Sequence, residues 1–191
     1  GWNVARLLES IAPLLNEPEQ LSQILDVYFE AIGEQQNSMW ARKLGFDEFK
    51  NEDVELVREL NALLQLVETD MTIFFRLLSE LERPDIESLN FAFYEEDKIP
   101  VKQWNEWLLK WWNRVDYTPD RVKMKLANPK YVFRNWMAQL AIEEAEKGDF
   151  SLCEELLKLL KNPYSEQMDM HSKWFSKRPE WAKSKVGCSM L

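Results

Sequence analysis

The sequence predicts an all-α protein of about eight helices. Only five glycines occur among the 191 residues, and Leu, Glu, Lys and Ala are abundant. Apolar side chains also recur along most of the chain at the three- and four-residue spacing of helices. The pattern weakens after Asn162. We therefore expect a helical region at 1–162 and a mostly irregular tail at 163–191.

The first helix is predicted from an apolar stripe that begins at Trp2 and ends before Asn16. Pro18 marks the start of the second helix, because proline is tolerated in the first turn. Gly33 should weaken this helix, and Gly45 should end it, since glycine readily adopts the left-handed backbone of a helix end.

A third helix is predicted to begin at Asp53, and a fourth to be capped by Thr69 or Asp70 and to end before Pro84. Residues 84–99 have no clear helical period and are predicted to form a loop. Its aromatic residues should attach this loop to the body of the protein: Phe91, Phe93 and Tyr94.

Pro100 leads into a helix with four tryptophans on one face, namely Trp104, Trp107, Trp111 and Trp112. Such rings can form a stacking platform for bases or a peptide. Packing between helices is the preferred interpretation, because the spacing follows the helix period and few basic residues interleave with the rings. The sequence Thr118-Pro119-Asp120 then predicts a short helix that runs to about Ala127.

The segment 128–150 predicts the next helix, with Asn128 as N-cap, Pro129 as first residue and Gly148 at its end. Its expected buried residues are Val132, Phe133, Trp136, Leu140 and Ala141. We assign no catalytic role to Arg134 or Asn135, and expect these two residues to anchor a buried polar contact.

Ser151 should cap the following helix, with Glu154 completing a capping box, and Asn162 should end it. The core face of this helix is predicted to contain Leu152, Leu156, Leu157 and Leu160. The two helices form a hairpin that occurs once, so the sequence does not predict a repeat array.

The composition excludes several functions. A net charge of −9 argues against general nucleic-acid binding. A local cluster near the C-terminus is interpreted as a charged tail: Lys173, Lys177, Arg178, Lys183 and Lys185. No apolar run approaches the ~18 residues of a membrane span.

No catalytic or metal-binding motif is evident. The five glycines are too scattered to cradle a phosphate, and His171 is the single histidine. Cys153 and Cys188 are the two cysteines, too few for a disulfide framework and too distant for a zinc site. A reducing compartment is the default expectation.

The order of several phrases resembles the C-terminal part of the selenoprotein O family. The similarity spans nearly the whole chain and is most specific at 128–167. Its phrases lie at 2–7 (WNVARL), 40–45 (WARKLG), 70–78 (DMTIFFRLL), 104–112, 128–142, 146–149 (EKGD), 162–167 (NPYSEQ) and 178–181 (RPEW).

This resemblance implies a parent protein with an atypical kinase fold that transfers AMP from ATP to Ser, Thr or Tyr hydroxyls of proteins, with Mg²⁺ or Mn²⁺. The family's nucleotide- and metal-binding residues precede the segment seen here, so none can be assigned in this chain. We therefore expect the chain to be inactive alone and to have the N-terminal kinase-like lobe as its partner. The implied compartment is mitochondrial for a eukaryotic parent and cytoplasmic for a bacterial one.

The family carries a redox cysteine or selenocysteine near its C-terminus, and Cys188 is the candidate here. Two other interpretations of the ending Cys-Ser-Met-Leu remain open. The chain could stop just before a selenocysteine position, or the four residues could form a prenylation signal.

Two functions are thus carried forward. The first is the helical C-terminal region of a protein adenylyltransferase, and the second is a free-standing helical module that binds a protein partner. An exposed apolar face at Trp2, Leu7 and Ile11 would favour the first, whereas a closed surface would favour the second.

Overall fold

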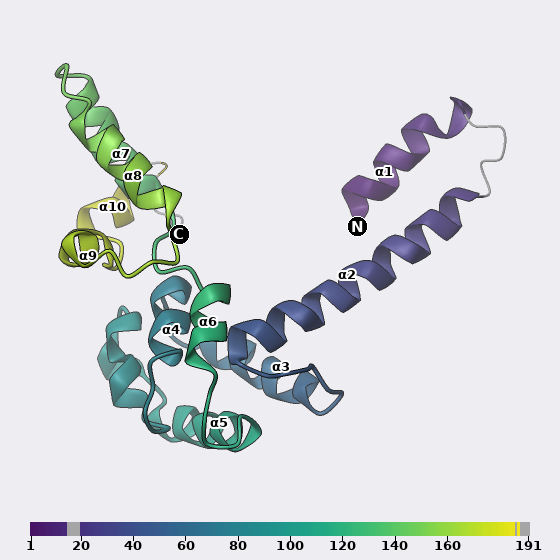
Figure 1. Cartoon of the computed structure of the whole chain (residues 1–191). Helices are drawn as coiled ribbons and strands as arrows, with labels where there is room; N and C mark the ends of the chain where they lie inside the picture. Colours follow the sequence, from purple (N-terminus) through teal and green to yellow (C-terminus); the bar gives the residue numbers. More distant parts are fainter. Residues whose placement is uncertain (15–19, 186, 188–191) are drawn as a thin grey trace.

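The computed structural model describes residues 1–14, 20–185 and 187. The described part of the chain contains ten α-helices and three 3-10 helices (Figure 1). In the same described part, β-type pairing is limited to one isolated antiparallel bridge between Thr69 and Phe93. The predicted all-α fold class is confirmed.

The N-terminal helices form an arm that projects from the body of the protein (Figure 1). It consists of α1 (Trp2–Ile11), η1 (Ala12–Leu14) and α2 (Gln20–Leu44). The end of the first helix and the start of the second were predicted at Asn16 and Pro18, which lie outside the described residues.

The helix α2 continues through Gly33 without a break, in agreement with the expected continuation to Leu44, and the weakening by Gly33 stays a prediction. Glycine in a helix interior costs only about 1 kcal/mol relative to alanine, and a helix of this length tolerates that cost. Gly45 ends α2 as predicted, with φ of +77°.

The body is built around the tryptophan face of α5 (Val101–Arg114), which packs against α3 (Asp53–Leu64). Trp107 donates its indole N–H to the Leu56 carbonyl and Trp111 donates to the Leu44 carbonyl, both at 2.9 Å. These rings are fully buried. The packing interpretation is therefore confirmed, and the platform interpretation is excluded.

Asp70 is the N-cap of α4 (Met71–Leu78), because its Oδ1 accepts from the Ile73 N–H at 3.1 Å. This helix packs against η2 (Ile86–Ala92), which is followed by η3 (Glu96–Lys98). The predicted loop at 84–99 thus contains two 3-10 helices. Phe93 attaches it to the core, whereas Phe91 is 46% exposed.

The short helix predicted to follow Thr118-Pro119-Asp120 is α6 (Arg121–Ala127), which ends at Ala127 as predicted, is capped by Asp120 and packs on α2. The following prediction is wrong: α7 spans Asn135–Ala145, and the backbone of 128–134 is not helical. The Asn128 amide instead donates to the Lys43 carbonyl at 2.9 Å. The N–H groups of Lys130 and Tyr131 donate to the Pro163 carbonyl at 2.8 and 3.1 Å.

Because this segment is extended, two side chains assigned to the buried stripe are exposed, Val132 by 38% and Phe133 by 53%. The later residues Trp136 and Ala141 are buried as predicted. Gly148 follows the helix with φ of +89°, as expected for a left-handed helix end.

The predicted capping box of α8 (Ser151–Lys161) is not formed. The Ser151 N–H donates to Asp149 Oδ1 at 2.9 Å, so Asp149 takes the role assigned to the serine. Leu156 is buried as predicted, but Leu157 is 59% exposed because Leu159 occupies the core instead.

The C-terminal segment contains two short helices, α9 (Met168–Trp174) and α10 (Glu180–Ser184), where mostly irregular structure was expected. Long-range packing orders this segment. Trp174 is buried against Trp136, with ring centroids 5.9 Å apart, and its N–H donates to Glu155 at 2.6 Å.

Candidate functional site

The sequence singled out few candidate residues. Cys188 and the remainder of the Cys-Ser-Met-Leu ending lie outside the described residues, so their redox, truncation and prenylation interpretations remain predictions. His171 stacks on Phe175, with ring centroids 5.1 Å apart. Cys153 is an exposed thiol on α8.

Arg134 forms a buried polar contact as predicted, whereas Asn135, for which the same was expected, is exposed. Its guanidinium binds both carboxylate oxygens of Asp70, with Nη2 at 2.7 Å from Oδ1 and Nη1 bonded to Oδ2. The side chains are 7% and 1% exposed. Asp70 caps α4 and Arg134 precedes α7, so the pair fixes the start of one helix against the start of the other.

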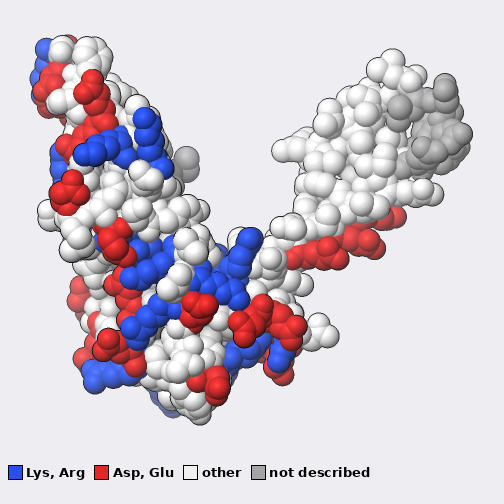
Figure 2. Space-filling view, viewed as in Figure 1, with Lys and Arg blue, Asp and Glu red and all other residues white. Residues whose placement is uncertain are grey.

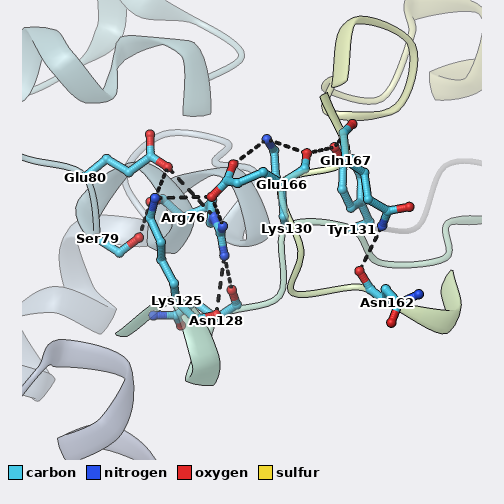
Figure 3. A network of polar contacts seen from close by, with 10 residues as sticks. All are labelled: Arg76, Ser79, Glu80, Lys125, Asn128, Lys130, Tyr131, Asn162, Glu166 and Gln167. Carbon is cyan, nitrogen blue, oxygen red and sulfur yellow. Dashed lines mark hydrogen bonds and ion pairs between the residues drawn. The ribbon is translucent and has the colours of Figure 1, made fainter. Parts of the chain in front are cut away.

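A larger polar network surrounds Glu166 (Figure 3). Its Oε1 accepts from Lys125 at 3.2 Å and from Arg76, and its Oε2 accepts from Lys130 at 2.8 Å. The Tyr131 hydroxyl donates to the Glu166 backbone carbonyl at 2.8 Å. Three cations from different parts of the chain thus converge on one carboxylate. We call this group the Glu166 network.

The electrostatics of the network keep Glu166 charged. Burial alone would raise the pKa of Glu166, but hydrogen bonds from Lys130, Lys125 and Arg76 outweigh burial and lower it to about 2. Burial raises the pKa of Tyr131, and the nearby negative charge of Glu166 raises it further. At neutral pH neither group exchanges a proton readily, so neither is suited to general acid–base catalysis.

The backbone next to Glu166 is held in an uncommon conformation. Gln167 has φ of +39°, in the left-handed region that residues other than glycine seldom adopt. Its side-chain amide donates to the Asn162 carbonyl at 2.8 Å (Figure 3). The same amide donates to the Leu159 carbonyl at 3.0 Å. These bonds fasten the end of α8 to the turn that presents Glu166.

The network is an internal junction rather than a reaction centre. Arg76 is 2% exposed and Lys130 has a side chain that is 4% exposed, so neither cation is open to a substrate. Across the described residues, no group of three or more His, Cys, Asp or Glu could hold a metal ion. The Mg²⁺ or Mn²⁺ implied by the resemblance therefore has no ligand cluster of this kind among the described residues.

The predicted basic cluster near the C-terminus is mostly engaged internally. Lys173 pairs with Glu155, Arg178 with Glu68 and Lys185 with Glu143. Lys177 donates to the Phe93 carbonyl at 2.6 Å. These cations therefore do not form an open phosphate-binding surface. Within the described ranges no helix is long and apolar enough to cross a membrane.

The arm carries the most open apolar surface. Trp2 is 73% exposed, Leu7 61% and Ile11 37%, and α1 contributes no buried residue. Several apolar residues of η1 and α2 are also exposed, namely Leu14, Ile24, Val27 and Phe29. In Figure 2 the acidic side chains of the arm form a stripe along one edge, and most of the remaining visible surface is uncharged. The observation that favours the adenylyltransferase hypothesis is therefore present.

Sequence reasoning did not identify Glu166 or Asp70 as the centres of buried polar contacts. Glu166 was noted only as part of the phrase 162–167, and Asp70 only as a helix cap. The sequence did offer a signal for Asp70. Arg134 was expected to make a buried polar contact, and a buried arginine needs an acidic partner such as Asp70. The partners of Glu166 are too far away in sequence to be inferred from spacing.

Comparison with known proteins identifies the family. The family model described as "Protein adenylyltransferase SelO" matches residues 1–161. Proteins named protein nucleotidyltransferase YdiU are similar over 100% of this chain. The protein from Flavobacterium johnsoniae is 45% identical, that from Aromatoleum aromaticum 41% and that from Rhodopirellula baltica 38%.

The chain spans only part of these relatives, covering 39%, 38% and 39% of their respective lengths. The match to the family model nevertheless includes all helices from α1 to α8. The chain therefore belongs to the SelO family of protein adenylyltransferases.

Proposed function

We propose that this chain is the C-terminal helical region of a longer protein adenylyltransferase, where it supports a kinase-like catalytic lobe. The longer protein would transfer AMP from ATP to Ser, Thr or Tyr hydroxyls of other proteins and release pyrophosphate. The bound ATP and divalent metal supply the reacting phosphate and its charge stabilisation. The described residues contain no group of three or more His, Cys, Asp or Glu that could hold the metal, so we expect the chain alone to be inactive.

The open apolar face of the arm is the observation that carries this proposal. Single exposed apolar side chains are normal, but a contiguous apolar surface generally marks an interaction site. Exposed apolar side chains occur on all three elements of the arm, α1, η1 and α2. A catalytic lobe that packs on the arm would bury these residues.

The body of the chain would give that lobe a fixed base. The buried pair between Arg134 and Asp70 and the Glu166 network connect α4, α6, α7 and the C-terminal segment. In this role their charges stabilise the arrangement of the helices and do not act on substrate.

The test compares this chain with a longer form of the relatives' length, using ATP labelled at the α-phosphate, Mn²⁺ and a mixture of proteins. We expect labelled protein with the longer form and none with the chain alone. In the longer form, Leu7→Asp should reduce labelling and lower the melting temperature, because Leu7 would lie in the interface. The control Leu157→Asp changes an equally exposed leucine on α8.

Absence of labelling by the longer form would refute the enzymatic proposal. Normal labelling and melting of the Leu7→Asp form would refute the packing of the catalytic lobe on the arm. Labelling by the chain alone would refute its expected inactivity. In the first case, the free-standing interaction module becomes the better description.

A further inference from the structure

A cavity of about 440 Å³ lies where the end of α2 meets α6, and its lining contains three cations and no carboxylate. The residues that matter to its chemistry are Arg42, Lys43, Lys123, Met39, Leu126 and Tyr164. A smaller cavity of about 170 Å³ also borders Lys43. Figure 2 shows basic side chains gathered over α6 and where α2 leaves the body. This positive hollow contrasts with the net charge of −9.

Lys43 is the most informative residue of this cavity. Lys43 lines both cavities, and its ammonium lies 4.0 Å from the centre of the Phe75 ring, which lines the smaller one. Burial lowers the pKa of Lys43. Among the described residues no carboxylate lies within ion-pair distance of it. A desolvated cation without a counter-ion is unfavourable, and an aromatic face compensates only in part. An anion in the cavity would provide the missing partner.

The other two cations extend the positive surface. Lys123 donates to the Phe46 carbonyl at 2.6 Å and lies 3.5 Å from Asp47, so its position is fixed by the loop after α2. Arg42 is exposed, and the structure shows no ion pair for it in the described ranges. Its guanidinium is therefore available to bind a planar or tetrahedral anion through two N–H groups.

The opposite lining is apolar. Met39 is 38% exposed, Tyr164 45% and Leu126 69%, so these side chains offer open surface beside the cations. Pockets that bind small molecules commonly measure about 300–1,000 Å³ and combine apolar walls with a few placed polar groups. This cavity has such a volume, with an apolar wall on one side and cations on the other.

We propose that the cavity binds a phosphate-bearing small molecule, with the phosphate against Lys43 and Arg42 and the uncharged part along Met39, Leu126 and Tyr164. A phosphate carries roughly 1.5–2 negative charges at neutral pH and has several acceptor oxygens. A phosphate ligand therefore suits a cluster of cations better than a ligand with a single carboxylate would. This inference is independent of the proposed adenylyl transfer, because the site is built from α2, α6 and Tyr164 of this chain alone.

The test needs a signal from this cavity, since a longer form of the protein is proposed to bind ATP elsewhere. Methionine methyl groups labelled with ¹³C give such a signal by NMR, and Met39→Leu assigns the Met39 resonance. The probes are AMP and inorganic phosphate. We expect a saturable shift of the Met39 methyl with AMP, tighter than with phosphate, and no shift of the exposed Met168 on α9.

Substitutions then identify the binding residues. Lys43→Gln and Arg42→Gln should each raise the Kd of AMP at least tenfold, because each removes a cation from the phosphate. Lys110→Gln is the matched control, since Lys110 pairs with Glu59 outside this cavity. Lys43→Gln should melt no lower than the unaltered protein, because it removes a charge that lacks a counter-ion. Any loss of binding is then not loss of the fold.

Absence of a saturable Met39 shift with either probe would overturn the proposal. An unchanged Kd in Lys43→Gln would do the same, since the phosphate would not lie where it is placed. AMP binding no tighter than inorganic phosphate would refute the role of the apolar wall.

Discussion

Replacing Arg134 by alanine should destabilise the protein strongly, because it leaves a carboxylate buried without its partner. Asp70 is 1% exposed and receives two hydrogen bonds from Arg134. Removing one member of a buried ion pair typically costs about 3–5 kcal/mol, most of it from the charge left behind. In a chain of this size that loss corresponds to a decrease in melting temperature of roughly 6–20 °C.

Urea unfolding followed by circular dichroism measures this loss. The control Arg58→Ala removes an exposed pair with Glu55, whose side chains are 76% and 56% exposed, and should leave the unfolding midpoint unchanged. The double variant Arg134→Ala with Asp70→Asn should recover part of the stability. Asparagine removes the buried charge but keeps an oxygen that can cap α4. A loss in Arg134→Ala no larger than that in Arg58→Ala would refute the reasoning.

Three further predictions follow from burial, charge and backbone geometry. Glu166 has its pKa lowered from 4.5 to about 2. Its charge therefore stabilises the fold above pH 4.5, and this contribution is lost as the pH falls towards 2. In acid titrations, the free energy of unfolding should fall more in this range for the unaltered protein than for Glu166→Gln. Gly33→Ala should stabilise α2 by about 0.4–1 kcal/mol in urea unfolding, whereas Gly45→Ala should cost roughly 1–2 kcal/mol because φ is +77°. Trp104→Ala should cost about 3–5 kcal/mol in the same assay, and Trp2→Ala, at a site 73% exposed, within ±0.5 kcal/mol.

Each of these has a clear contrary result. Parallel acid curves for the unaltered protein and Glu166→Gln would show that the network does not depend on the charge of Glu166. Equal effects at Gly33 and Gly45 would show that the left-handed backbone is not what requires glycine. Equal losses for Trp104→Ala and Trp2→Ala would place both rings in similar surroundings.

The parts of the fold that depend on interactions between residues close in sequence were predicted well. The tryptophan face of α5 follows the helix period, so its burial could be inferred directly. Asp70 and Gly148 act at helix ends through their own side chain or backbone, and their roles were predicted correctly. Asp120 caps a helix whose start was predicted from Thr118-Pro119-Asp120.

The failures occur where distant contacts override a local signal. Asn128-Pro129 has the form of a helix start, yet the backbone stays extended because Lys43 and Pro163 offer it hydrogen-bond partners from far away in the sequence. The cations that contact the Glu166 carboxylate lie 36 to 90 residues away from it in the sequence, so no spacing rule could have grouped them with it. Local patterns in the sequence therefore predict helices better than they predict the polar contacts between helices.

The contacts of the C-terminal segment have a consequence for how the molecule responds to a protease. The turn between α7 and α8 is exposed, and cleavage there divides the polypeptide near Gly148. The released piece would remain bound, since Glu166 keeps its bonds to Arg76 and Lys130, and Arg178 keeps its bond to Glu68. A nicked molecule should therefore migrate as one species on a native gel and as two on a denaturing gel. The C-terminal helices are thus held by side chains as well as by the peptide backbone. The two pieces of the cleaved chain should reassemble when they are mixed.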